Sequence, residues 1–262
     1  MADHQMPTWI FLRGLTREAA HWGTFAEVFR ASMPGARVMA LDLPGNGQFH
    51  AMPSPSSISE MVNFCRLELA RRSKKPPFYL LAMSLGAMVA AEWSAQAPQE
   101  VAGCVLINTS LRPFSAFYQR LRPRNYAPLL RLALCGATPA VWERTVRCLT
   151  SNDTTPREEL IADWVTIRLA HPVRAGNALR QLLAAARYRA DTQPPATRVL
   201  LLASVHDRLV SVTCSRSIAA RWGYPLALHP WAGHDLALDD PAWVARQVRQ
   251  WLVQASKESA DD

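Results

Sequence analysis

The sequence predicts an α/β domain with a mostly parallel sheet of about six strands, flanked by helices and interrupted by a helical insertion. Short apolar runs alternate along the chain with segments of helical pattern. Continuous apolar runs are typical of strands that are buried on both faces of a parallel sheet. The expected strands cover residues 8–12, 38–41, 78–82, 101–108, 198–203 and 226–229.

Two of the intervening helices follow from clear patterns. Apolar side chains recur at helical spacing from Ile58 to Leu69, with Ser57 or Ser59 as a candidate N-cap. Residues 85–97 are rich in small side chains, which let a helix pack close to a sheet, and Pro98 ends the segment. This alternation of strands and helices predicts a sheet covered on both faces.

One long segment breaks the alternation. Residues 110–195 contain no good strand pattern, and prolines separate the helix-like pieces within them. We therefore expect a helical cap at residues 111–194, inserted into a core formed by residues 1–110 and 195–262.

Composition narrows the class of protein. The 262 residues are 49% hydrophobic and 19% charged, with a net charge of +8, which is typical of a globular chain with a basic surface. The chain has no nucleic-acid motif, no signal peptide and no apolar stretch of about 18 residues, so we expect neither a nucleic-acid partner nor a membrane span. Scattered cysteines in odd number favour reduced thiols and a cytoplasmic location. They are Cys65, Cys104, Cys135, Cys148 and Cys214.

A candidate nucleophile lies where one apolar run meets the small-residue helix. The turn that exposes a nucleophilic serine between a strand and a helix is so sharp that only small residues fit two positions before and after it. Ala82 and Gly86 stand at these positions around Ser84. The N–H groups of the following helix could then stabilise an oxyanion. A serine that merely caps a helix is the alternative.

Two further polar residues follow later apolar runs. Asp207 comes shortly after the run at 198–203, and His234 follows the run at 226–229. An imidazole can remove the serine proton near neutral pH, and a buried carboxylate orients the imidazole. We therefore predict Ser84 as nucleophile, His234 as general base and Asp207 as the orienting acid. His206 is expected at the rim, and Asp235 in a loop or at a helix end.

No metal or cofactor is expected. The seven histidines lack the spacing of metal ligands, and no phosphate-binding glycine loop is present. The serine chemistry needs only a small-molecule acyl ester as substrate.

Four motifs resemble, in chain order, those of the α/β-hydrolase superfamily, and the resemblance covers about the whole chain. Residues 11–15 (FLRGL) resemble its oxyanion loop, although Arg13 stands where the family usually has His. Residues 42–47 (DLPGNG) resemble its D-x-P-G-x-G turn, and the turn at Ser84 and the Gly233-His234 loop follow. The chain is similar to small carboxylesterases with a helical cap, such as the pimeloyl-carrier-protein methyl ester esterase group.

The resemblance implies roles for further residues. The backbone N–H groups of Leu15 and Leu85 would form the oxyanion hole. The helical insertion would cover the active site. The turn at residues 42–47 would be structural, with glycines that permit positive φ.

Several residues are candidates for substrate binding. Arg13 could bind a substrate carboxylate or phosphate, or it could pair with a structural acid beneath the site. His21 and Trp22 could line the acyl side of the pocket or pack the first helix. Met83 and Ser110 could also line the pocket, although Met83 equally fits a core position.

The predicted function is cleavage of a carboxylic ester through an acyl-enzyme on Ser84. One alternative is a thioesterase or acyltransferase that acts on a carrier- or CoA-bound acyl group. Five arginines and no acids occur between Val101 and Trp142. This charge pattern favours the second function, with an acidic acyl carrier protein as partner. A solvated basic face would explain the same pattern. A non-catalytic ligand receptor with the same fold is the other alternative.

Overall fold

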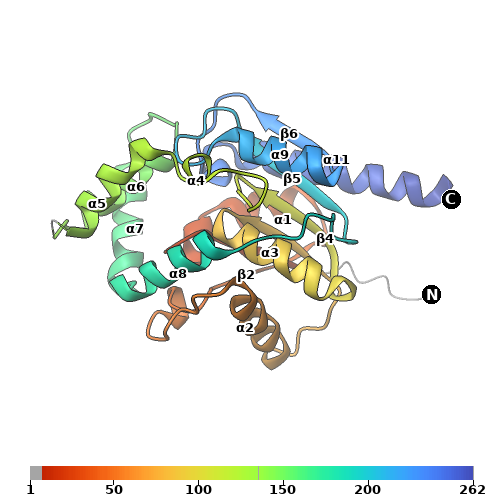
Figure 1. The fold of residues 1–262 in the computed structure, drawn as a ribbon, viewed down its shortest axis with the longest axis horizontal. Coiled ribbons are helices and arrows are strands. Elements are labelled where there is room, and N and C mark those ends of the chain that lie inside the picture. Colours follow the sequence, from red (N-terminus) through yellow and green to blue (C-terminus); the bar gives the residue numbers. More distant parts are fainter. Residues whose placement is uncertain (1–7, 135, 262) are drawn as a thin grey trace.

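The computed structural model describes residues 8–134 and 136–261, and its centre is a six-stranded sheet (Figure 1). The strand order is β2-β1-β3-β4-β5-β6, and every neighbouring pair is parallel. This confirms the predicted sheet. The strands are β1 (Thr8–Leu12), β2 (Arg37–Leu41), β3 (Phe78–Met83), β4 (Val101–Ile107), β5 (Val199–Ser204) and β6 (Leu226–His229).

Alternate side chains of the strands fill two separate cores. Trp9 and Phe11 of β1 face one core, which they share with α1 (Phe25–Ser32) and α11 (Pro241–Asp261). Ile10 and Leu12 face the other core, under the helices α2 (Ile58–Arg71), α3 (Leu85–Gln96) and α9 (Val212–Trp222). Because both faces of the sheet are covered, the strands read as continuous apolar runs.

Five α-helices lie between β4 and β5 in the part of the chain that the structure describes. Four of them, α5, α6, α7 and the start of α8, gather at the left of Figure 1, away from the end of α11. Within the described part of this segment, the β structure consists of one isolated bridge between Arg112 and Arg189. These helices are α4 (Phe117–Arg120), α5 (Tyr126–Leu134), α6 (Pro139–Thr150), α7 (Glu158–Ala170) and α8 (Ala175–Arg187). We refer to α4–α8 as the cap.

The remaining elements are short. The turn at residues 42–47 has the expected positive φ at Gly45 (90°) and Gly47 (50°). Its Asp42 accepts a hydrogen bond from the Ala19 N–H at 2.6 Å and ties two loops together. No helix in residues 8–134 or 136–261 is long and apolar enough to cross a membrane. Cys135 lies outside the described residues. The short helices are α10 (Leu236–Asp239), η1 (Ala19–Trp22), η2 (Gly47–Phe49), η3 (Pro98–Glu100) and η4 (Pro123–Asn125).

Candidate active site

Ser84 forms the sharp turn between β3 and α3. Its φ of 55° and ψ of −114° are strained for a residue with a side chain. The turn brings α3 very close to β1, because a Cβ added to Gly86 would lie 2.5 Å from the Leu12 carbonyl oxygen. A glycine is therefore required two residues after the serine, as the sequence motif predicted.

The loop that follows β1 lies directly against this serine. A Cβ added to Gly14 would lie 3.2 Å from the Ser84 Cβ and 3.8 Å from its Oγ. Leu15 is the next residue of this loop, and Leu85 is the first residue of α3, where backbone N–H groups have no acceptor within the helix. The two predicted oxyanion donors therefore belong to two segments that both adjoin the serine.

His234 and Asp207 form a buried pair. The His234 Nδ1 and Asp207 Oδ2 atoms are 2.7 Å apart, and the two residues are 3% and 2% exposed. The other oxygen of Asp207 accepts hydrogen bonds from the N–H groups of Leu209 (2.7 Å) and Val210 (2.9 Å). Burial alone would lower the pKa of His234, but the charge of Asp207 and its hydrogen bond outweigh burial and leave that pKa raised.

The segment after β4 connects the histidine and the serine. The Asn108 side-chain amide donates to the His234 carbonyl oxygen at 2.8 Å. The next residue, Thr109, donates from its hydroxyl to the Ser84 carbonyl oxygen at 3.1 Å. Sequence reasoning missed this role of Asn108, whose only signal is its position at the end of an apolar run. The predicted triad residues are thus held at one edge of the sheet, after β3, β5 and β6.

Arg13, for which the sequence left open a substrate-binding role or a pair with a structural acid, is buried and forms the pair. Its Nη1 and Nη2 atoms bind the Asp235 carboxylate at 3.1 and 2.6 Å, and both side chains are 3% exposed. The guanidinium also lies 4.8 Å from the centre of the Trp22 ring. The alternative role, pairing with a structural acid, therefore holds. Asp235 lies at the start of α10, as expected of a helix-end residue.

Trp22 and Met83 pack in the core formed with α1 and α11. Trp22 is 5% exposed and stacks against Phe25 with ring centres 5.3 Å apart. Met83 belongs to the same cluster and is 3% exposed. The contacts of both residues are those of core side chains, and none of them supports a role in the substrate pocket.

His21 and Ser110 are buried polar residues at the boundary between the cap and the core. The His21 Nδ1 accepts from the Glu18 N–H at 3.1 Å, and its ring lies against Trp164 of α7. Burial, followed by the charges of Arg17 and Arg13, holds the pKa of His21 far below its ordinary value, so the ring is neutral. The Ser110 hydroxyl accepts from the Arg120 Nε at 3.4 Å. His206 is exposed, as expected of a rim residue.

The cap is joined to the core by a buried carboxylate that the sequence did not reveal. Glu143 of α6 is 1% exposed and accepts from Arg17 Nη1 at 2.6 Å and from Arg168 Nε at 2.7 Å. Arg17 follows the loop beside Ser84, whereas Arg168 is part of α7. A second link joins the Thr16 N–H to the Gln181 Oε1 of α8 at 2.9 Å.

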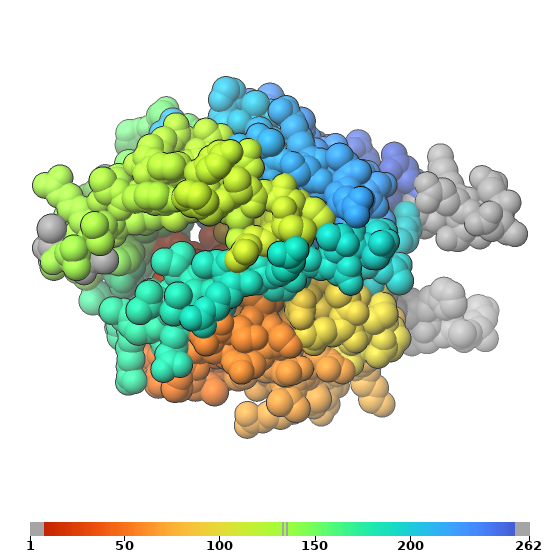
Figure 2. All heavy atoms as spheres, viewed as in Figure 1, coloured from red at the N-terminus to blue at the C-terminus, as the bar shows by residue number. Residues whose placement is uncertain are grey.

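The surface is hollowed between the segments of the cap. In Figure 2 a hollow separates the yellow-green part of the cap from the teal α8, and red atoms of the N-terminal part of the chain show at its bottom. Among the described residues, no group of three or more His, Cys, Asp or Glu side chains could hold a metal ion.

A parallel sheet with a strained serine turn and a buried histidine–carboxylate pair defines the class of α/β hydrolases. The model of the alpha/beta hydrolase family matches residues 9–247, and the chain belongs to this family of enzymes. Pimeloyl-[acyl-carrier protein] methyl ester esterase of Xylella fastidiosa (strain M12) is 26% identical over 221 residues, which cover 77% of this chain and 78% of that protein.

Two solved structures show the same fold at low sequence identity. A thermophilic esterase from Thermogutta terrifontis has a TM-score of 0.73 and 19% identity, with 95% of this chain and 90% of that chain covered. The 2-hydroxy-6-oxo-6-phenylhexa-2,4-dienoate hydrolase of Rhodococcus sp. strain RHA1 has a TM-score of 0.74 and 17% identity, with 95% and 91% covered.

Proposed function

We propose that this protein is a serine hydrolase that cleaves a carboxylic ester of a small acyl substrate. The single observation that carries the proposal is the buried contact of 2.7 Å between His234 Nδ1 and Asp207 Oδ2, at the sheet edge where Ser84 forms its strained turn. A carboxylate on Nδ1 fixes the tautomer in which Nε2 is free to act as a base.

The proposed reaction has two steps. His234 removes the hydroxyl proton of Ser84 as its oxygen attacks the ester carbonyl, and the same proton goes to the departing alkoxide. Water, activated by His234, then cleaves the acyl-enzyme. The N–H groups of Leu15 and Leu85 stabilise the oxyanion, and each such donor is worth on the order of 10²- to 10³-fold in turnover. The chain needs no metal or cofactor for these steps.

An activity-based probe tests this proposal. Treatment with a fluorophosphonate should give a single covalent adduct in intact-protein mass spectrometry, and Ser84→Ala should abolish it because the nucleophile is gone. Ser94→Ala is the matched control, since it removes a buried hydroxyl of α3 that is no part of the candidate site and should keep the adduct. A folded wild type that forms no adduct would instead support a ligand receptor on the same fold.

A second candidate function is the cleavage of an acyl group carried by an acidic acyl carrier protein. The name of the 26% identical relative, a pimeloyl-[acyl-carrier protein] methyl ester esterase, favours this candidate. The carrier would dock on basic residues of the cap such as Arg131, which is exposed. Arg131→Glu should then raise KM for a carrier-bound ester and leave KM for a free ester unchanged.

A further inference from the structure

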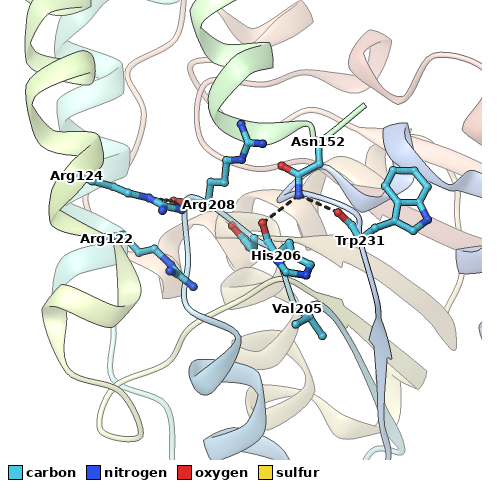
Figure 3. A pocket seen from close by; sticks show the side chains of 8 residues that line it. Arg122, Arg124, Asn152, Val205, His206, Arg208 and Trp231 are labelled. Atoms are coloured by element: carbon cyan, nitrogen blue, oxygen red, sulfur yellow. Dashed lines mark hydrogen bonds between the residues drawn. The ribbon is translucent and has the colours of Figure 1, made fainter. Parts of the chain in front are cut away.

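A polar cavity of about 400 Å³ lies beside the loop that carries Asp207 (Figure 3). The cap contributes Arg122, Arg124 and Asn152 to its lining, and the core contributes His206, Arg208 and Trp231. The volume is within the range of small-molecule sites. The proposed ester hydrolysis uses none of these six side chains.

The cavity carries uncompensated positive charge. None of the guanidinium groups of Arg122, Arg124 and Arg208 forms an ion pair within residues 8–134 and 136–261. The Nε of Arg122 is buried and has no acceptor among the described residues. Asp207 is the one acid in the lining, and its oxygens already bind His234 and two backbone N–H groups. Three guanidinium groups without an ion-pair partner give the cavity a positive potential, so the site favours an anionic ligand.

The walls of the cavity are held in place by hydrogen bonds. The Asn152 Nδ2 donates to the carbonyl oxygens of His206 (3.0 Å) and Trp231 (2.8 Å), as the dashed lines of Figure 3 show. The Nη2 of Arg124 donates to the Arg208 carbonyl oxygen at 3.0 Å. Among the described residues, these contacts leave the guanidinium of Arg208 without a hydrogen-bond acceptor and available to a ligand.

We propose that this cavity is a binding site for a phosphate group, adjacent to the proposed ester site, with which it shares the loop of Asp207. Several guanidinium groups around one cavity match the multiple acceptor oxygens of phosphate better than a single carboxylate. The phosphate is either free inorganic phosphate or the phosphate of a small organic ester, whose organic part would lie against Trp231. The proposal does not depend on the esterase activity, because binding is measured directly.

The experiment is calorimetric titration of the full chain with inorganic phosphate and, separately, with adenosine monophosphate, at an ionic strength kept constant with KCl. The wild type should bind phosphate, and Arg122→Gln with Arg208→Gln should weaken binding by at least about tenfold, because the loss of a single charged hydrogen bond already has about that effect. Tighter binding of the nucleotide than of phosphate identifies a phosphate ester as the ligand, and equal binding identifies the free anion.

The matched control is Arg246→Gln with Arg249→Gln, which removes the same charge from exposed positions of α11. This variant should bind phosphate as the wild type does. The single variant Arg208→Gln repeats the test with one exposed side chain, so that a folding defect of the double variant does not decide it. The proposal is wrong if the wild type binds neither ligand, if the control loses as much affinity as the cavity variant, or if the cavity variants lose none.

Discussion

At the scale of single residues, Arg13 shows that an arginine near a candidate active site can bind a buried carboxylate of the protein instead of a substrate. The pair is buried, bidentate and adjacent in sequence to Gly14 and His234, which contact or belong to the proposed machinery. It therefore connects the loop after β1 with the loop after β6. We expect its charges to matter for stability and for the positions of these two loops.

Two variants of the pair test this expectation. Asp235→Asn should lower the free energy of unfolding by about 3–5 kcal/mol, because it leaves a buried guanidinium without its counter-charge. Arg13→Met together with Asp235→Leu should cost much less, since no charge remains buried. Urea denaturation of the two variants and the wild type gives the comparison. Equal losses in both variants would show that packing, and not charge, dominates.

The His234–Asp207 pair predicts the pH dependence of the reaction. His234 must be neutral to accept a proton as the proposed base, and its pKa is raised above the ordinary 6.5. The rate kcat/KM should therefore rise with pH through an apparent pKa above 6.5. Asp207→Asn should shift this limb to lower pH and reduce turnover on the order of 10⁴-fold.

The matched control for the pH profile is Asp240→Asn, measured on the same ester. Asp240 accepts from the buried His229 at 3.1 Å and thus forms a second histidine–carboxylate pair outside the proposed triad. Its replacement should leave the acidic limb where it is. If Asp240→Asn shifts the acidic limb and Asp207→Asn does not, the titrating group is His229 and the prediction for His234 is wrong.

The local residues of the site were predictable, and the distant partners were not. Ser84 and Gly86 obey a steric rule that acts within a few residues, so a short motif is enough to find them. Arg13 and Asp235 are 222 positions apart, and only the folded chain brings them together. The sequence therefore left two roles open for Arg13, and the geometry decides between them.

At the scale of elements, the cap is attached to the core by polar side chains as well as by apolar packing. Glu143 lies between Arg17 of the core and Arg168 of the cap, and Gln181 binds the Thr16 N–H. The segment from Gly14 to Arg17 is thus fixed by the nucleophile at one end and by the cap at the other. Motion of the cap and the shape of the oxyanion loop should be coupled.

Glu143→Gln tests this link. In this variant the guanidinium groups of Arg17 and Arg168 have no shared counter-charge. The free energy of unfolding should therefore fall by about 3 kcal/mol, and hydrogen exchange in α6 and α7 should increase. Glu158→Gln is the control, because that carboxylate is 72% exposed and its pair with Arg144 should be worth less than about 1 kcal/mol. Similar exchange in both variants would mean that the cap does not depend on the buried carboxylate.

The elements themselves were predicted unevenly for a physical reason. Each strand is buried on both faces, so its apolar run stands out, and all six expected runs became strands. The cap helices bury few of their side chains, and prolines interrupt the segment, so the pattern indicated the region of these helices without their bounds. Glu143 looked like any charged residue on such a helix.

At the scale of the whole molecule, the parallel sheet explains why the site assembles where it does. The carboxyl ends of parallel strands meet at one edge, so the turns after β3, β5 and β6 converge although they are far apart in the sequence. The cavity with the unpaired arginines lies at the same edge, beside the loop of Asp207. A ligand there would contact the loop that orients His234.

The two ends of the cap meet at a narrow neck. Arg112 and Arg189 form a β-bridge, and the Ala190 N–H donates to the Arg112 carbonyl oxygen at 2.7 Å. The strands that lead in and out, β4 and β5, are also direct neighbours in the sheet. The separation of the ends is therefore independent of how many residues the cap contains, and longer insertions cost little loop entropy. Caps of other lengths could be exchanged at this neck, so evolution can change substrate choice while the reaction chemistry stays intact.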